Sequence, residues 1–314
     1  MAVTIGVDVG GTTVAAGVVD EQGSVLATAQ RDTPSDDPRR TEDVIVEVVG
    51  ELAASHDVEA VGVGAAGFVD AQRSTVLFAP NLAWRDEPLR AGIEGRCGLP
   101  VVIENDANAA AWGEVRFGAG RGEDFVVVLT VGTGIGGGIV LGGRLLHGRF
   151  GVAGEIGHIN MVPDGRRCGC GLEGCWEQYA SGGALVKEAQ ELAEASPAMA
   201  ADLLRLAGGK AEMITGPVVT QAAQEGDVAA LRCFDVVGTW LGRGMAQLAA
   251  VLDPGLFVLG GGVSAAGELL RGPAGRAMLQ YLTARGHRPH AELRVAELGP
   301  EAGIVGAGDL ARDR

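Results

Sequence analysis

The chain has 314 residues, of which 47% are hydrophobic and 21% charged, so its composition excludes a disordered protein and predicts about two globular domains. Its formal net charge of −15 disfavours nonspecific contact with phosphate backbones, and no nucleic-acid partner is expected. Without an apolar run of about 18 residues or a signal peptide, the chain is expected to be cytoplasmic with no membrane partner.

The first third of the chain predicts a mixed sheet with helices. Residues 41–56 place their apolar side chains on one helical face. Residues 58–67 form a buried strand that ends in glycines, and residues 101–115 read as a strand, a short turn and a helix. Further strands are expected at Val3–Val9, Val14–Val19 and Val25–Ala29.

The pattern then restarts near residue 125. The stretch FVVVLTVGTGIGGGIVLGG is a strand, a glycine turn and a strand, as at the N-terminus. Helices dominate from Ala184 to about Leu252, and two more strands, in LFVLGGGVS and AELRVAEL, precede a last helix in GIVGAGDLAR. Two halves that open alike predict a duplicated α/β unit, with two similar domains around a cleft.

The first glycine turn, DVGGTT at residues 8–13, is a candidate phosphate site. Gly10 and Gly11 permit a tight turn whose N–H groups, with the hydroxyls of Thr12 and Thr13, can face a phosphate. Asp8 at the strand end can orient Mg²⁺. An ordinary hairpin with a solvated acid is the alternative.

The second glycine turn, VGTGIGGG, has the G-x-G-x-x-G spacing at Gly132, Gly134 and Gly137. A dinucleotide fingerprint opens a helix, whereas a strand follows here, which favours a second phosphate turn over an NAD site. Three glycines in LGGGVS, residues 259–264, leave room for a flat ligand. Close packing of a strand on a helix explains them equally well.

Asn105 and Asp106 follow a strand end in ENDANAAAWGE. A carboxylate at the mouth of a cleft is suited to act as general base for a hydroxyl group. Aspartate is also a preferred N-cap, so Asp106 can equally begin the following helix. Both interpretations stand at this stage.

Three of the five cysteines lie within eight residues, and a histidine stands ten residues before the first of them. Three thiolates and one imidazole suit a closed, tetrahedral, structural zinc site. A disulfide is disfavoured by the expected compartment and by the odd local count. Cys97 and Cys233 stand apart in predicted helices and are expected to be buried apolar residues. The predicted zinc ligands are His158, Cys168, Cys170 and Cys175.

Two glutamates, Glu155 and Glu177, flank this cysteine loop. Zinc on one ring nitrogen of His158 leaves the other nitrogen free to bind a ligand. Two carboxylates and an oriented imidazole make a receptor for several hydroxyl groups. A solvated loop is the alternative.

Six motifs in a fixed order resemble the ROK family (repressor, open reading frame, kinase) over essentially the whole chain, and within it the bacterial kinases that phosphorylate glucose. The motifs are DVGGT, PNLAW, ENDANAAAWGE, TVGTGIGGGIVLGGRLLHGRFGVAGEIGH, CGCGLEGCWE and LGGGV. The resemblance implies an actin-like, hexokinase-like (ribonuclease H-like) α/β fold with two domains around a central cleft. We expect a small domain of residues 1–112 plus 300–314, and a large domain of 113–299 carrying the zinc loop.

The resemblance implies transfer of the γ-phosphoryl group of Mg-ATP to the 6-hydroxyl of glucose, with Asp106 as catalytic base. The sugar-binding residues are then expected to be Gly67, Asn81, Asn105, Asp106, Glu155, His158 and Glu177. Residues near ATP and Mg²⁺ are expected to be Asp8, Gly10, Gly11, Thr12, Thr13, Thr133, Gly134, Gly261 and Gly262. The family also implies a homo-oligomer, a dimer or tetramer.

Several alternatives remain open. Another ROK sugar kinase would act on N-acetylmannosamine, N-acetylglucosamine, mannose or fructose. Whether polyphosphate replaces or accompanies ATP as donor is also open. A sugar-sensing protein without catalysis is a further possibility, as is a dehydrogenase that uses the second glycine turn. Because DVGGT begins at residue 8, no helix-turn-helix domain of a ROK repressor is expected before it.

Overall fold

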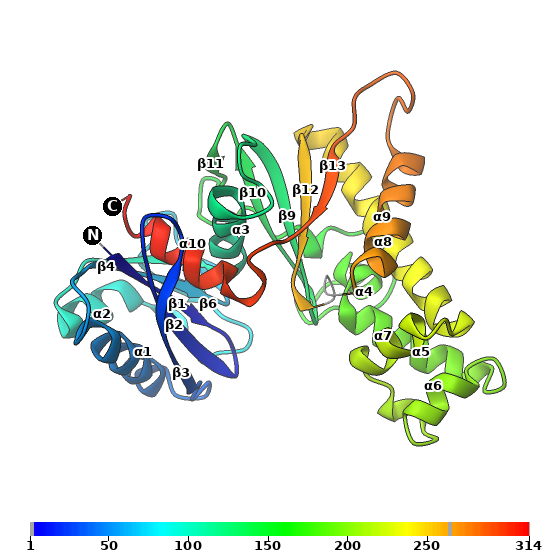
Figure 1. Ribbon diagram of the computed structural model, residues 1–314, viewed down its shortest axis with the longest axis horizontal. Helices are drawn as coiled ribbons and strands as arrows, with labels where there is room; N and C mark the ends of the chain where they lie inside the picture. The colour runs from blue at the N-terminus through cyan, green and yellow to red at the C-terminus, as the bar shows by residue number, and fades with distance from the viewer. Residues whose placement is uncertain (1–2, 263–265, 314) are drawn as a thin grey trace. The chain divides into compact units, whose positions relative to one another are not determined.

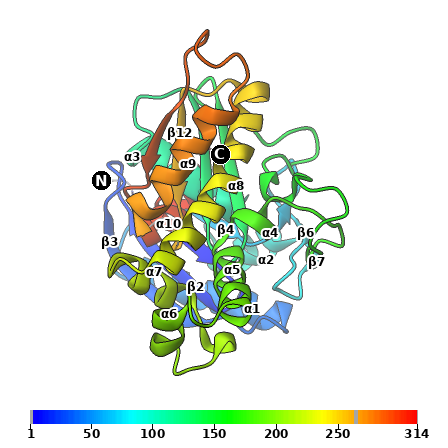
Figure 2. The ribbon, with the colours of Figure 1, turned by 90° about the vertical axis from the view of Figure 1, so that its right-hand side faces the viewer.

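A computed structural model describes residues 3–262 and 266–313 (Figures 1 and 2). The chain divides into two compact units. The first unit contains Met1–Val128, Gly137–Gly154 and Ala296–Arg314, and the second contains Leu129–Gly136 and Glu155–Val295. The bounds of these units differ from those of the two domains expected from the sequence, and the expected domains stay a prediction.

A five-stranded sheet in the order β3-β2-β1-β4-β8 forms the centre of the first unit. β1 pairs antiparallel with β2 and parallel with β4, and β4 pairs parallel with β8. The expected strands of the first third are therefore confirmed, and β3 is longer than expected. The strands are β1 Val3–Val9, β2 Thr13–Val19, β3 Val25–Asp32, β4 Val58–Ala65 and β8 Val101–Asn105.

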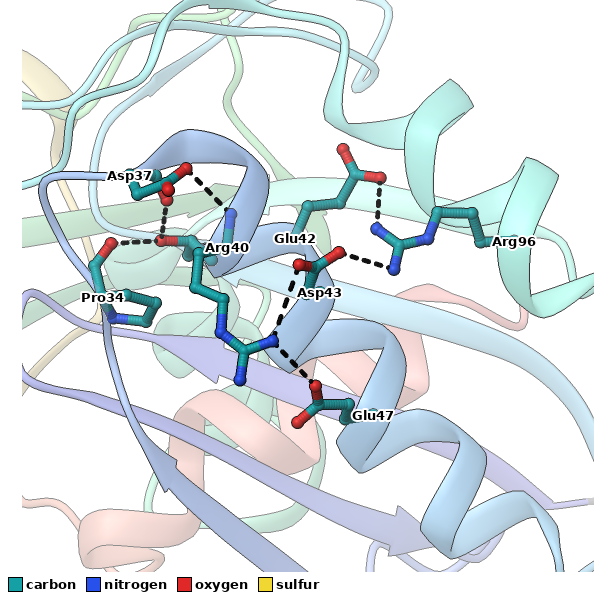
Figure 3. A network of polar contacts seen from close by, with 8 residues as sticks. Pro34, Asp37, Arg40, Glu42, Asp43, Glu47 and Arg96 are labelled. Atoms are coloured by element: carbon teal, nitrogen blue, oxygen red, sulfur yellow. Dashed lines mark hydrogen bonds and ion pairs between the residues drawn. The ribbon is translucent and has the colours of Figure 1, made fainter.

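The α-helices in the described part of the first unit are α1 Pro38–Ala53, α2 Leu89–Cys97, α3 Asp106–Phe117 and α10 Ala302–Leu310. The apolar face predicted for α1 is buried, including Ile45 and Val49. Figure 3 shows how α1 begins: the Asp37 side chain accepts a hydrogen bond from the Arg40 N–H at 3.0 Å. Arg96 of α2 pairs with acids on α1, and exposed pairs of this kind contribute about 0–1 kcal/mol each.

Close packing of α10 accounts for several of the 52 glycines. A Cβ atom on Gly6 of β1 would overlap the Ile304 carbonyl of α10, and one on Gly306 of α10 would overlap the Ala109 carbonyl of α3. Figure 1 shows α10 beside α3 and across β1. Side chains at these positions would push the helix off the sheet, so glycine here sets the distance between backbones.

A small three-stranded sheet, in the order β5-β6-β7, has no counterpart in the sequence prediction. Its strands are too short for an alternating pattern to emerge. Trp84, in the connection between β6 and β7, is fully buried. The strands are β5 Phe68–Val69, β6 Val76–Phe78 and β7 Arg85–Glu87.

The second large sheet has five strands in the order β11-β10-β9-β12-β13. It opens with a strand, a glycine turn and a strand (β9 and β10), as the first sheet does with β1 and β2. This agrees with the expected repetition of one α/β plan. The strands are β9 Phe125–Val131, β10 Ile135–Leu141, β11 Arg144–Leu145, β12 Leu256–Gly260 and β13 Glu292–Val295.

The second unit is rich in helices, as expected from residue 184 onward. Figures 1 and 2 show α8 and α9 side by side. The helices α5 and α7 contact α8, and α6 contacts α5 and α7. Sequence analysis missed α9, whose pattern is weakened by glycines and by Pro273 inside the helix. The helices are α4 Glu177–Ala180, α5 Gly182–Ala195, α6 Ala201–Leu206, α7 Gly216–Gln224, α8 Val228–Leu252 and α9 Glu268–Tyr281.

The described residues also form short 3₁₀ helices: η1 Ile156–His158, η2 Ala211–Met213 and η4 Gly299–Glu301. Within residues 3–262 and 266–313, no helix combines the length and apolar character needed to cross a membrane.

Candidate active site

The three parallel strands β1, β4 and β8 end at one edge of the first sheet, and several predicted site residues lie at this edge. Asp8 pairs with Gly64 of β4, and Ala65 pairs with Asn105 of β8. A Cβ atom on Gly64 would lie 3.6 Å from the Cα of Asp106. Because parallel strands share the direction of their carboxyl ends, Asp8 and Asp106 reach the same side of the sheet.

Asn105 holds Asp106 in place. The Asn105 side-chain amide donates to Asp106 Oδ1 at 3.0 Å and to the Gly67 carbonyl at 3.1 Å, while its oxygen accepts from the Asn108 N–H at 3.0 Å. Asn105 is therefore the N-cap of α3, and the N-cap interpretation of Asp106 is wrong. Asp106 is the first residue of the helix.

The pKa values of both carboxyls at this edge are raised. Burial raises the pKa of Asp106 to about 6, although hydrogen bonds from main-chain N–H groups and from Asn105 act to lower it. Burial and then the charge of Asp106 raise the pKa of Asp8 to about 6. A carboxylate with this pKa is ionised at neutral pH and is a stronger base than an ordinary aspartate.

The DVGGTT segment forms the predicted tight turn. The Gly10 N–H donates to the Thr13 carbonyl at 2.9 Å, and the Thr33 hydroxyl donates to the Gly10 carbonyl at 2.9 Å. A Cβ atom on Gly11 would lie 3.1 Å from the Cβ of Asn81, so the PNLAW motif lies directly beside this turn. Sequence analysis passed over Thr33, which anchors the turn from the end of β3.

The VGTGIGGG segment is a strand-to-strand turn, as expected, and not the opening of a helix. The Gly132 N–H donates to the Gly134 carbonyl at 3.0 Å. The Ile135 N–H faces Glu177 Oε2 at 3.4 Å, and a Cβ atom on Gly134 would overlap that oxygen. The exposed Thr133 lies at the tip of this turn.

Gly261 follows β12 with a positive φ of 83°, a region that favours glycine. A Cβ atom there would lie 2.6 Å from the Val131 carbonyl, so the glycine permits close approach of the backbone to the end of β9. Gly262 is exposed beside it. The remainder of the LGGGVS motif, residues 263–264, lies outside the described residues.

The cysteine loop brings four predicted ligands together. The ligand atoms of His158, Cys168, Cys170 and Cys175 all lie within 4.8 Å of one another. The Cys170 and Cys175 sulfurs are 3.6 Å apart, as are Cys168 Sγ and His158 Nδ1. Bond lengths of about 2.3 Å to sulfur and 2.0 Å to nitrogen give tetrahedral edges of roughly 3.5–3.8 Å. The four residues therefore fit a zinc ion.

The two glutamates of the predicted receptor lie around His158. Its Nδ1 faces the cysteines, and its Nε2 is 4.0 Å from Glu155 Oε2. Glu177 Oε1 lies 3.0 Å from Cys168 Sγ and 3.9 Å from His158 Nδ1. Glu177 thus joins the cysteine loop to the second glycine turn.

The remaining cysteines agree in part with expectation. Cys233 is buried in α8, whereas Cys97 at the end of α2 is only half-buried. Within the described part of the chain, neither cysteine belongs to a group of three or more residues that could bind a metal ion.

The predicted site residues thus fall into two groups, one in each unit. The first group lies at the edge of the first sheet and contains Asp8, Gly10, Gly11, Thr12, Thr13, Gly67, Asn81, Asn105 and Asp106. The second group surrounds the second glycine turn and the cysteine loop and contains Thr133, Gly134, Glu155, His158, Cys168, Cys170, Cys175, Glu177, Gly261 and Gly262.

Known proteins resemble this chain over its whole length. Residues 4–314 match the ROK family. The chain is 50% identical to a glucokinase of Streptomyces coelicolor over 313 residues, which cover 100% of this chain and 98% of that protein. It is 38% identical to a glucokinase of Thermotoga maritima, over 99% of this chain and 97% of that protein.

A solved structure matches equally well. The crystal structure of a ROK family glucokinase from Streptomyces griseus, in complex with glucose and AMPPNP, superposes with a TM-score of 0.90 at 54% identity. The match covers 99% of this chain and 100% of that one.

Proposed function

Because the chain belongs to the ROK family, we propose that it is a sugar kinase that transfers the γ-phosphoryl group of ATP to the 6-hydroxyl of glucose. The observation that carries the proposal is Asp106, a half-buried carboxylate with a raised pKa, oriented by Asn105 at a sheet edge beside a glycine turn. Full-length relatives that are named glucokinases support the choice of glucose.

In the proposed reaction Asp106 accepts the proton of the sugar hydroxyl as its oxygen attacks the γ-phosphorus. The bond from the γ-phosphorus to the bridging oxygen breaks, and ADP leaves with the electron pair. Phosphoryl transfer of this type depends mainly on positioning and on stabilisation of charge. The hydrogen bond from Asn105 supplies positioning, because it fixes which carboxylate oxygen faces away from the amide.

The glycine turns are proposed to hold the phosphates. Their compact main-chain geometry, anchored by Thr33 in the first turn, presents N–H groups and the hydroxyls of Thr12, Thr13 and Thr133. Asp8 offers a carboxylate of the kind that magnesium prefers, directly or through water. Magnesium bound with ATP would neutralise charge on the phosphates.

The sugar hydroxyls are proposed to bind polar groups from both sets of site residues. Asn81, Asn105 and the main chain at Gly67 supply one set, and Glu155, His158 and Glu177 supply the other. The His158 ring offers Nε2 to a hydroxyl, because Nδ1 faces the cysteine sulfurs. We propose that zinc at His158, Cys168, Cys170 and Cys175 has a structural role and fixes this orientation.

We also propose three further properties: the bounds of the domains, the localisation and the oligomeric state. The small domain is taken as residues 1–112 plus 300–314, and the large domain as 113–299. The enzyme is expected to be cytoplasmic, and it is expected to form a dimer or tetramer. Sedimentation velocity at several protein concentrations measures the last property directly.

The test is product formation from Mg-ATP across a sugar panel, read by mass spectrometry. The panel contains glucose, mannose, fructose, N-acetylglucosamine and N-acetylmannosamine. Glucose 6-phosphate is expected as the main product. The variant Asp106→Asn should fold normally and lose about 10²–10⁴-fold in kcat, which is the usual contribution of a general base.

Other outcomes are equally informative. A different dominant product would assign the chain to another ROK sugar kinase. Phosphorylation with polyphosphate alone would change the donor. If no sugar reacts with either donor although sugar binds, the protein senses sugars and the kinase proposal is wrong.

A further inference from the structure

Glu104 is an acid buried in the first sheet, directly before the Asn105–Asp106 pair. It is 2% exposed, and in β8 it follows three apolar residues, Val101–Ile103. A buried carboxylate is costly unless it is paired and hydrogen-bonded, so its partners indicate its role. The proposed reaction does not use this residue.

The Glu104 carboxylate uses both of its oxygens. Oε1 accepts from the Asn105 N–H at 3.0 Å and from the Asn108 side-chain amide at 3.0 Å. Oε2 accepts from His147 Nε2 at 2.8 Å and pairs with Arg73 Nε at 3.2 Å. Since an ionised carboxylate only accepts hydrogen bonds, the His147 Nε2 must carry a proton.

Arg73 reaches Glu104 from a rigid turn. The Asp70 carboxylate accepts from the Ser74 N–H at 2.7 Å and closes this turn, in which Arg73 has a φ of 55°. The Arg73 carbonyl accepts from the Ile103 N–H at 3.1 Å, so the turn is also tied to β8. The main chain that carries the Arg73 side chain is therefore anchored to β8, and the guanidinium pairs with Glu104 from this anchor.

His147 comes from a separate loop that follows β11. The Ala153 N–H donates to the His147 carbonyl at 3.1 Å and closes the loop at its base. Gly151 in this loop packs against the main chain at Asp70, where a Cβ atom would overlap it. Glu104 thus ties two loops of the first unit to the end of β8.

The charge of Glu104 agrees with this geometry. Burial acts to raise its pKa, but the hydrogen bond and charge of His147, followed by the charge of Arg73 and the hydrogen bond from Asn108, lower it below its usual range. The carboxyl is therefore ionised at neutral pH and remains an acceptor for all its donors.

We propose that Glu104 is a positioning residue for phosphoryl transfer: it holds the Asn105 main chain, and Asn105 in turn orients Asp106. The inference rests on the proposed function, because it takes Asp106 as the group that accepts the proton. Glu104 does not touch the reacting atoms.

The variant Glu104→Gln tests this role. Glutamine has one acceptor oxygen instead of two, so either Asn105 and Asn108 or His147 lose their acceptor, and Arg73 loses its charged partner. We expect kcat to fall about 30- to 100-fold, since small misplacement of a catalytic group costs about 10²-fold. The KM for Mg-ATP should stay within about threefold, because the groups that bind it remain in place. The KM for glucose should rise by a smaller factor than kcat falls, because Asn105 is only one of several sugar-binding groups.

Glu114 provides a matched control. It is 1% exposed and, at the other end of α3, accepts from the N–H groups of Ala119 at 2.9 Å and Leu298 at 2.8 Å. Glu114→Gln also removes a buried carboxylate, so both variants should lose several degrees in Tm. Only Glu104→Gln should lose kcat.

Two variants of His147 test whether a hydrogen-bond donor at this position is enough to preserve kcat. Glutamine at this position can still donate to Glu104, whereas alanine cannot. His147→Gln should therefore keep kcat within about fivefold of the wild-type value, and His147→Ala should lose about as much as Glu104→Gln. Equal losses in the two His147 variants would contradict a role through the hydrogen bond.

Two results would overturn the inference. The first is a Glu104→Gln variant with nearly wild-type kcat and the same loss of Tm as Glu114→Gln, which makes Glu104 merely structural. The second is a rise in KM for glucose at unchanged kcat.

A failure of the proposed function can be distinguished from these two results. It appears as a wild-type enzyme that phosphorylates no sugar. In that case amide hydrogen exchange over residues 104–108 still decides the positioning claim. Exchange should be faster in Glu104→Gln than in Glu114→Gln, and equal exchange overturns it.

Discussion

Asp8 and Asp106 are two acids at one sheet edge, and both have pKa values raised to about 6, mainly by burial. Each is therefore ionised at neutral pH but close to taking up a proton. For Asp106 this suits a base that must accept a proton and later release it. The same shift makes activity sensitive to mild acid.

The expected pH profile follows from these values. Because only ionised Asp106 accepts the proton, kcat/KM should fall about tenfold per pH unit below about pH 6 and level off above it. Initial rates with glucose between pH 5 and 8 measure this. A level profile down to pH 5 would exclude Asp106 as the base with this pKa.

Unfolding in acid must be distinguished from this loss of activity. Both carboxyls bind protons more readily in the folded than in the unfolded chain, so their contribution to stability is present below about pH 4 and is lost as pH rises through about 6. Between pH 7 and pH 5 these two groups therefore make the fold more stable, not less. Denaturant melts at both pH values provide the control.

At the scale of elements, the cysteine loop from His158 to Glu177 connects metal binding with substrate binding. Glu177 begins α4, contacts Cys168 and lies against the second glycine turn. If zinc holds the four ligand atoms, it also holds the receptor glutamate and the His158 ring. Loss of the metal should then affect the sugar more than the nucleotide.

Protein purified without chelator should contain one zinc per chain by elemental analysis. Cys170→Ser should lose the metal and raise the KM for glucose about 10- to 100-fold, with a change of less than about threefold in the KM for ATP. Cys97→Ser, outside the cluster, should keep both zinc and KM. Absence of zinc in the wild-type protein, or equal effects on both substrates, would contradict the model of the loop.

At the scale of the whole molecule, the net charge of −15 acts differently on the two proposed substrates. Glucose is neutral, whereas Mg-ATP is an anion that enters a predominantly negative field. Salt shortens the range of that field from about 30 Å at 0.01 M to about 8 Å at 0.15 M. The two KM values should therefore respond differently to ionic strength.

We expect the KM for Mg-ATP to fall about two- to threefold when ionic strength rises from 0.01 to 0.15 M, while the KM for glucose stays constant. Steady-state kinetics at fixed free Mg²⁺ measures both. A KM for Mg-ATP that rises with salt would show that a local positive site outweighs the net charge.

Much of this protein follows from its sequence. The long strands and α1 are visible as periodic apolar runs, and the cysteine cluster and glycine turns are visible as spacings, because all these signals are local. The short strands β5–β7 and the glycine-broken α9 were missed because they carry no clear period. Sequence alone also did not decide whether Asp106 is the N-cap of α3 or a catalytic base.

Only the tertiary structure decided contacts between distant segments. Asn105 caps α3 through the Asn108 N–H and at the same time reaches Gly67. The role of Glu104 follows only from Arg73 and His147 beside it. Sequence determines which residues can bind phosphate, metal or protons, because that depends on side-chain chemistry. The fold determines which of them meet, and through burial it determines their pKa values, since both depend on neighbours that lie far along the chain.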